Sequence, residues 1–242
     1  MGRYFVSKRL KFFLSHLMVS ILLASLLIWL VFFIWYPAPL VDALGVKHLF
    51  LILIAIDIII GPLLGLFVYK EHKKGLKFDL MVVVCIQLSA FAYGFYTIAK
   101  GRPAWLVYDT YVFHLVKNSD IEQGKITLAQ PQFQKTVWSK PQFVNLDSSI
   151  FKKNPVPQGT IVINHPMYYS DISNAKPQMQ SVASPISLLE KYNGKQIVSA
   201  ILQKYPNADA WLGLSAPAKD MVVLINKEKG EVVKIVDLRP WK

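Results

Sequence analysis

Residues 49–69 read LFLILIAIDIIIGPLLGLFVY, a run that is apolar throughout except for Asp57. A bilayer core of about 30 Å requires about 20 residues of α-helix, so this run is long enough to cross a membrane. Two more apolar runs of sufficient length flank it, at residues 12–36 and 80–99. The first is too long for the apolar part of a cleaved signal peptide. Residues 1–100 therefore predict a membrane domain of three transmembrane helices, at about 12–36, 49–69 and 80–99.

The basic residues between these runs predict the orientation of the chain. Four of them lie before the first run, namely Arg3, Lys8, Arg9 and Lys11. Four more lie between the second and third runs, namely Lys70, Lys73, Lys74 and Lys77, whereas residues 37–48 carry only Lys47. Basic loops remain on the cytoplasmic side of a membrane. We therefore expect a cytoplasmic N-terminus and a C-terminal domain on the far side.

Residues 101–242 have the mixed composition of one folded domain. A hairpin is predicted at the end, with strands at 221–225 and 231–238 around a polar turn. Other segments indicate strands at 104–115 and 160–164 and helices at 187–192 and 195–205, whereas 118–154 gives no clear signal. We expect a membrane protein whose three transmembrane α-helices are followed by an α+β domain with an antiparallel sheet.

The composition argues against several classes of function. The net charge is +12, but no Lys/Arg-rich run with interleaved aromatics indicates a nucleic-acid site. Cys85 is the single cysteine and falls in the third apolar run, so neither a disulfide nor a cysteine-ligated zinc site is expected. The sequence lacks common catalytic and cofactor motifs and the spacings of metal ligands. We expect no catalytic residue, metal or cofactor.

Asp57 is the residue most at odds with its surroundings, because an acidic side chain inside a membrane must avoid lipid. It shares one helix face with Gly61 and Gly65, a G-x-x-x-G spacing that permits close helix packing, and Pro62 is expected to kink the helix. This face is a candidate binding site for a partner helix. Two alternatives remain: a hydrogen bond from Asp57 within its own helix bundle, and a proton relay.

Depth in the membrane suggests internal partners for Asp57. At about 1.5 Å of rise per residue, Ser25 and Tyr93 lie nearly as deep as Asp57, about 18–20 Å from the cytoplasmic ends of the runs. Gln87 and Ser89 are shallower. Ser25 and Tyr93 are therefore the expected partners within the bundle.

Two further positions are candidates for contacts outside the membrane. Arg102 and Pro103 follow the third run directly, where Arg102 would bind lipid phosphate or an acidic group of its own domain. Arg239 and Trp241 lie at the C-terminus and form either a partner contact or the closing part of the domain's core.

The chain carries, in this order, Asp57-x-x-x-Gly61-Pro62-Leu63-Leu64, Gly101-Arg102-Pro103-Ala104-Trp105-Leu106-Val107-Tyr108 and Asp237-Leu238-Arg239-Pro240-Trp241. These three segments resemble the TfpX/TfpZ family of type IV pilin accessory proteins. The resemblance covers most of the chain and is weakest across residues 118–154. One departure is Tyr111-Val112-Phe113, which replaces an acidic-basic-aromatic triplet that is frequent in the family.

The resemblance implies a non-catalytic, chaperone-like protein of the Gram-negative inner membrane that acts on the major type IV pilin. The Asp57, Gly61 and Gly65 face would hold the pilin's transmembrane helix, and the periplasmic domain would contact the pilin head. Membrane lipid is a further expected partner. The alternative is a non-catalytic scaffold of another envelope complex, for secretion or division.

Overall fold

The computed structural model describes residues 7–153 and 159–241. The chain divides into two compact units. The first, the helical unit, comprises the described residues up to Ile34 together with Val46–Ala99. The second, the sheet unit, comprises Trp35–Gly45 together with the chain from Lys100 onward. The sheet unit therefore includes a segment that lies in the sequence between the first and second apolar runs.

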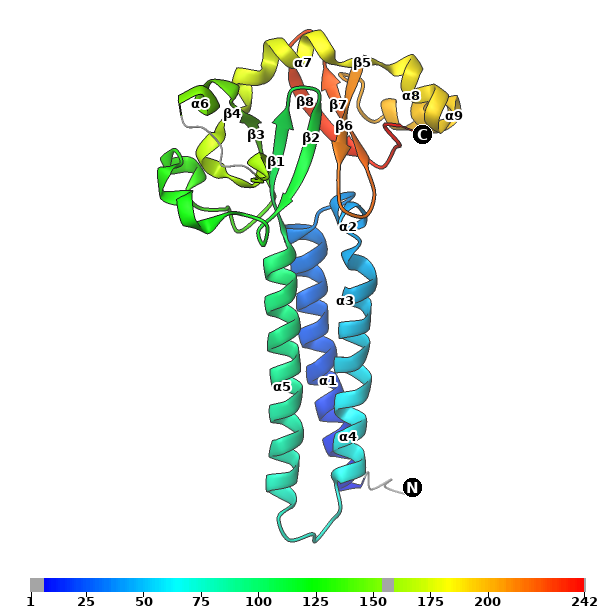
Figure 1. The fold of residues 1–242 in the computed structure, drawn as a ribbon. Coiled ribbons are helices and arrows are strands. Elements are labelled where there is room, and N and C mark those ends of the chain that lie inside the picture. Colours follow the sequence, from blue (N-terminus) through cyan, green and yellow to red (C-terminus); the bar gives the residue numbers. More distant parts are fainter. Residues whose placement is uncertain (1–6, 154–158, 242) are drawn as a thin grey trace. The chain divides into compact units, whose positions relative to one another are not determined.

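The helical unit contains three long helices, shown in Figure 1. Among the described residues, three helices are long and apolar enough to cross a membrane, Lys8–Trp35, Val46–Val68 and Leu76–Gly101, which confirms the expected three long apolar helices. Ser7 caps the first, because its hydroxyl accepts a hydrogen bond from the backbone N–H of Leu10 (3.2 Å). The first long helix consists of α1 (Lys8–Trp29) and η1 (Leu30–Trp35). The second consists of α3 (Val46–Ala55), η2 (Ile56–Ile60) and α4 (Gly61–Val68), and the third is α5 (Leu76–Gly101).

The second long helix changes its hydrogen-bonding pattern around Asp57. The segment η2 is a π-helical turn, and Pro62 follows it at the start of α4. Proline has no backbone N–H and its ring crowds the preceding turn, so a regular α-helix cannot continue through this position. A π turn is a common way to absorb such an irregularity. The expected effect of Pro62 on the helix therefore takes the form of a widened turn.

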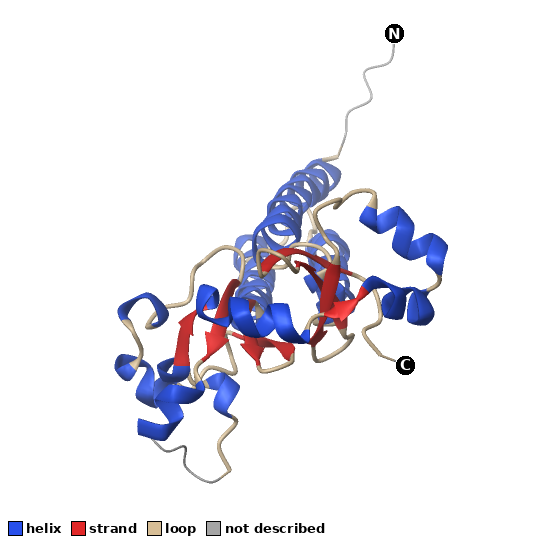
Figure 2. Ribbon diagram, turned by 90° about the horizontal axis from the view of Figure 1, so that it is seen from above, coloured by secondary structure: helices blue, strands red, loops and turns tan. Residues whose placement is uncertain are grey.

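The described residues of the sheet unit form an eight-stranded sheet with the order β4-β3-β1-β2-β6-β7-β8, and β5 pairs with β6 outside this path. Figure 2 shows the strands as adjacent red arrows. The α+β prediction is confirmed. The sheet was expected to be antiparallel and is instead mixed, because β1 and β3 are parallel, as are β2 and β6. The strands are β1 (Pro103–Asp109), β2 (Val112–Lys117), β3 (Gln142–Leu146), β4 (Tyr169–Asp171), β5 (Ser184–Pro185), β6 (Ala210–Ser215), β7 (Met221–Asn226) and β8 (Glu231–Val236).

The helices of the sheet unit are short and connect the strands. Two of them, α8 and α9, match the helices expected at 187–192 and 195–205, and β7 with β8 confirms the predicted hairpin. The α-helices are α2 (Leu40–Ala43), α6 (Ser148–Lys153), α7 (Lys176–Val182), α8 (Ile186–Asn193) and α9 (Lys195–Leu202). The remaining helical segments are η3 (Gln123–Leu128), η4 (Pro131–Phe133), η5 (Val162–Asn164), η6 (Pro166–Tyr168) and η7 (Ile172–Ala175).

Two strand predictions were wrong. The segment 104–115 is a hairpin of β1 and β2 and not one strand, because Thr110 adopts a left-handed conformation (φ 52°) that reverses the chain. The segment expected as a strand at 160–164 contains the 3-10 helix η5. Its apolar residue Ile161 is 63% exposed, so the short apolar pattern does not mark a buried strand.

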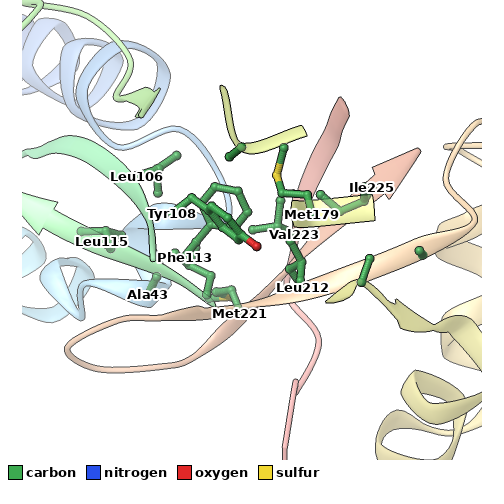
Figure 3. Packing of buried hydrophobic residues seen from close by; sticks show 14 of the residues in the cluster. Ala43, Leu106, Tyr108, Phe113, Leu115, Met179, Leu212, Met221, Val223 and Ile225 are labelled. Carbon is green, nitrogen blue, oxygen red and sulfur yellow. The ribbon is translucent and has the colours of Figure 1, made fainter. Parts of the chain in front are cut away.

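The main core of the sheet unit lies on one face of the sheet and includes α2. The rings of Tyr108 and Phe113 pack at an angle of 52° with their centroids 5.1 Å apart, near Met221 and Val223 (Figure 3). Leu40 and Ala43 of α2 belong to the same cluster. The carbonyl of Ala43 also accepts hydrogen bonds from the backbone N–H groups of residues 218 and 219, at 3.0 and 3.2 Å. The link between the first two long helices is thus an integral part of the sheet unit.

Candidate functional site

Asp57 lies in the π-helical turn of the second long helix, and its side chain is only 9% exposed. The side-chain amide of Gln87, from α5, donates to the backbone carbonyl of Asp57 at 3.0 Å. The same amide lies 3.3 Å from Ser20 Oγ of α1, also as a donor. One side chain therefore joins the three long helices at the level of the irregular turn.

The partners expected from depth were wrong. Ser25 donates its hydroxyl to the carbonyl of Ile21 in its own helix, at 2.8 Å. Tyr93 is 74% exposed. Neither side chain hydrogen-bonds to Asp57, and the shallower Gln87 contacts its backbone instead. Rise along a helix gives depth, but it does not give the face on which a side chain lies.

The two glycines that share a face with Asp57 are covered by side chains of the same chain. A Cβ atom placed on Gly61 would lie 2.2 Å from Gln87 Oε1, and one on Gly65 would lie 2.8 Å from Phe12 Cε1. Gly94 of α5 is similarly close to Leu53, at 1.9 Å. Gly61 and Gly65 therefore pack within the bundle, and Pro62 is buried beside them.

A cavity of about 300 Å³ lies among α1, α5 and the second long helix. Its lining is mostly apolar, with polar side chains contributed by Ser15, His16, Ser20, Asp57 and Gln87. Val19 and Leu88, which also line it, are 54% and 55% exposed. The cavity therefore reaches the outer surface of the helical unit and has Asp57 among its inner walls.

Several polar atoms around this cavity lack hydrogen-bond partners in the part of the chain that the structure describes. The Asp57 carboxylate takes part in no hydrogen bond or ion pair there. His16 Nδ1 and Gln87 Oε1 are buried and equally unsatisfied. Buried polar groups are nearly always hydrogen-bonded in native proteins, so such a cluster requires an explanation.

Arg102 is buried in the sheet unit, with 6% of its surface exposed. Its guanidinium donates to Thr136 Oγ1 (3.0 Å) and to the carbonyl of Val137 (3.3 Å), and it lies 5.1 Å from the ring centre of Trp138. Burial lowers the pKa of this guanidinium, although an arginine remains charged. Pro103 begins β1 directly after it. Arg102 therefore holds the 136–138 segment, and a contact with lipid stays a prediction.

Arg239 and Trp241 also contact their own unit. Arg239 pairs with Asp237 and donates to the carbonyl of Asp220. Trp241 Nε1 donates to Asp220 Oδ2 at 2.9 Å, and its ring covers Gly213 so closely that an added Cβ would lie 2.5 Å away. Trp241 is nevertheless 44% exposed. These contacts match the alternative in which the C-terminus closes the domain, and the partner contact stays a prediction.

Sequence reasoning missed Gln87, Ser20, His16 and Gly94 as parts of the site. A glutamine within an apolar run was the available signal, because a polar side chain in a membrane must find partners. The contact of the Gln87 side chain with Asp57 follows from the packing of α5, and it could not be inferred from the spacing of residues within one helix.

Comparison with known proteins links the chain to fimbrial assembly. The family model "Fimbrial assembly protein FimB" matches residues 5–45, which include the first long helix and α2. Three relatives come from Dichelobacter nodosus. The fimbrial assembly protein of serogroup I is 36% identical over 122 residues, 49% of this chain and 47% of the relative. That of serogroups C1 and C2 is 38% identical over 109 residues, 44% of this chain and 82% of the relative.

The extent of these matches differs between the relatives. This chain aligns with about half the length of the serogroup I protein. It also aligns with 47% of the length of the serogroup E1 protein, to which it is 35% identical. It spans most of the serogroups C1 and C2 protein. No solved structure matches the chain. On the similarity to the serogroups C1 and C2 protein and the agreement with the FimB model, the chain belongs to the fimbrial assembly protein family.

Proposed function

We propose that this protein is a non-catalytic assembly factor for type IV pili that binds the major pilin in the inner membrane and stabilises it or promotes its assembly. The observation that carries the proposal is the membership of the fimbrial assembly family in a chain with three helices of membrane length. The resemblance of its motifs to the TfpX/TfpZ family supports type IV pili as the kind of fimbria.

The proposed topology has a cytoplasmic N-terminus and a periplasmic sheet unit. It is supported by the basic residues before the first helix and between the second and third. Alkaline phosphatase, which is active only outside the cytoplasm, tests it. A fusion after residue 242 should be active, and a fusion within residues 70–75 should be inactive. The reverse pattern would refute this orientation.

A pilin subunit waiting in the membrane presents one long apolar helix and a globular head, and the two units of this protein match these parts. We propose that the pilin helix lies along the outer opening of the cavity between α1 and α5, which has Asp57 among its inner walls. Gly61, Pro62 and Gly65 have a positioning role, because they let α4 lie close to its own neighbours. The sheet unit then contacts the pilin head.

The decisive experiment is a pull-down of the tagged protein from its native cells in mild detergent, together with a pilin immunoblot in a deletion strain. We expect the major pilin to be enriched with the tagged protein and depleted when the gene is deleted. Enrichment of another envelope complex with unchanged pilin would refute the proposal and favour a scaffold for secretion or division.

Photo-crosslinking locates the contact within the membrane. A photoreactive amino acid at Val19 or Leu88, at the opening of the cavity, should crosslink to the pilin. The matched control is Ile59, which is 54% exposed and does not line the cavity. Equal crosslinking from all three positions would exclude a defined contact at the cavity.

A further inference from the structure

The cavity of the helical unit collects unsatisfied polar atoms from three helices. His16 Nδ1 comes from α1, the Asp57 carboxylate from the second long helix and Gln87 Oε1 from α5. Asp57 is nine-tenths buried and lines the cavity, although its carboxylate has no partner within the described residues. The chain thus maintains an arrangement that costs stability unless something else completes it.

The unsatisfied atoms define what would complete them. A carboxylate and an amide oxygen are hydrogen-bond acceptors, and a neutral histidine nitrogen accepts when its other nitrogen carries the proton. The group that pairs with the Asp57 carboxylate must therefore donate hydrogen bonds. Lipid tails have no donors, so filling the cavity with acyl chains would leave these atoms unsatisfied.

The apolar part of the lining restricts which kind of molecule can carry such a donor. Most of the wall is apolar, including Leu23, Leu27 and Phe91, so the donor must be surrounded by apolar groups. A volume of about 300 Å³ is at the lower end for small-molecule pockets, which suits a side chain and excludes a whole helix. A transmembrane helix with one donor side chain meets both conditions.

We propose that this cavity is an intramembrane recognition site for a hydrogen-bond donor, an ammonium, amide or hydroxyl group, carried by a transmembrane helix of the partner. Asp57 is the acceptor, and His16 and Gln87 belong to the polar part of the cavity's lining. The identification of that helix as the pilin's rests on the proposed function, whereas the donor chemistry does not.

Designed helices test the donor chemistry without the pilin. The full-length protein is reconstituted in lipid vesicles with single-span Leu/Ala helices that carry a central lysine, glutamine or serine, or no polar residue. Binding is measured by energy transfer between labels on the protein and the helix. The best donor helix should bind about tenfold more tightly than the helix without a donor, the gain expected of one charge-assisted hydrogen bond. Equal binding of all four helices would overturn the proposal.

Two substitutions assign the preference to the cavity. Asp57→Leu should abolish it, and Asp57→Asn should reduce it, because the asparagine retains one acceptor oxygen. Asp42→Asn, in α2 of the sheet unit, is the matched control and should leave it unchanged. The Asp57 carboxylate has no internal hydrogen bond to lose, so the amount of folded Asp57→Leu protein should hold. A donor preference that persists in Asp57→Leu would refute the assignment.

The results separate this inference from the proposed function. If the designed helices show the donor preference but the native protein does not retain pilin, the site stands and its partner is another membrane protein. If pilin is retained but the designed helices bind alike, the assembly role stands and the recognition chemistry assigned to the cavity is wrong.

Discussion

The two units of this protein differ in how completely they bury their own residues. In the sheet unit, Trp105, Tyr108 and Phe113 are fully buried, and the clusters around them extend over the sheet. In the helical unit, buried residues make up 22% of the most apolar stretch of each of the first two long helices, and 6% for α5. The sheet unit is completed by its own chain, whereas the helical unit leaves most of its apolar surface to its surroundings.

This difference teaches that burial has a different meaning in each unit. Lipid can cover the apolar side chains of α5 as well as protein can, so their exposure needs no protein partner. The tails of lipid molecules cannot hydrogen-bond to Asp57. The informative features of the helical unit are therefore its few polar atoms and its closely packed glycines, whereas those of the sheet unit are its large aromatic side chains.

The largest expected effect is in the sheet unit. Trp105 is fully buried, with ring centroids 5.8 Å from Phe133 and 5.7 Å from Tyr169. Trp105→Ala should lower the free energy of unfolding of this unit by about 3–5 kcal/mol, because it leaves a large cavity. Chemical denaturation followed by fluorescence measures it. Trp29→Ala, at a side chain that is 56% exposed on α1, is the control, and an equal loss there would contradict the comparison.

The next effect tests close packing in the helical unit. Gly94→Leu should destabilise the bundle by about 1–3 kcal/mol, because the new side chain would occupy the space of Leu53. Thermal unfolding in detergent measures the loss. Ala92→Leu adds a side chain at an exposed position of the same helix and should have little effect. Equal stability of the two variants would show that α5 does not pack closely at Gly94.

A smaller effect is expected at the C-terminus. Asp220 accepts from the backbone N–H of Ala216 (3.0 Å) and from Trp241 Nε1 (2.9 Å). Asp220→Ala should cost about 1 kcal/mol, the usual net contribution of such hydrogen bonds, since it leaves these donors without their acceptor. Trp241→Phe removes only the indole donor and should cost less. If Trp241→Phe instead abolishes pilin retention at unchanged stability, the C-terminus is a partner contact.

The smallest effect is a pH dependence from His114 in β2. Burial lowers the pKa of His114, while the nearby Asp109 acts in the opposite direction. As the pH falls, His114 therefore becomes protonated in the unfolded chain at a higher pH than in the folded chain. This makes the unit less stable as the pH falls below about 6.5, the usual pKa of histidine. His114→Gln should flatten the dependence of the unfolding midpoint between pH 7 and pH 5. An unchanged slope would exclude His114 as its source.

Sequence reasoning succeeded where one physical signal dominates. Hydropathy identified the three long helices, and the polar turn after residue 225 identified the hairpin of β7 and β8. It missed the turn at Thr110, where a non-glycine residue adopts a positive φ, and the strands β3 and β4, which depend on pairing with β1 and with each other. Asp57 was recognised as unusual, but the roles of Gln87 and the two glycines depend on packing between helices, which a single sequence does not encode visibly.

The placement of α2 has a consequence for how the protein is made. Leu40 and Ala43 leave the ribosome long before β6 and β7, whose side chains belong to the same cluster and whose connecting turn hydrogen-bonds to Ala43. The sheet unit therefore cannot complete its core by folding as each segment emerges. Its first piece must wait, unprotected, until two more apolar helices and most of the C-terminal chain have been synthesised. We expect chains that stop before residue 210 to be cleaved by proteases near α2, so that only the completed chain survives.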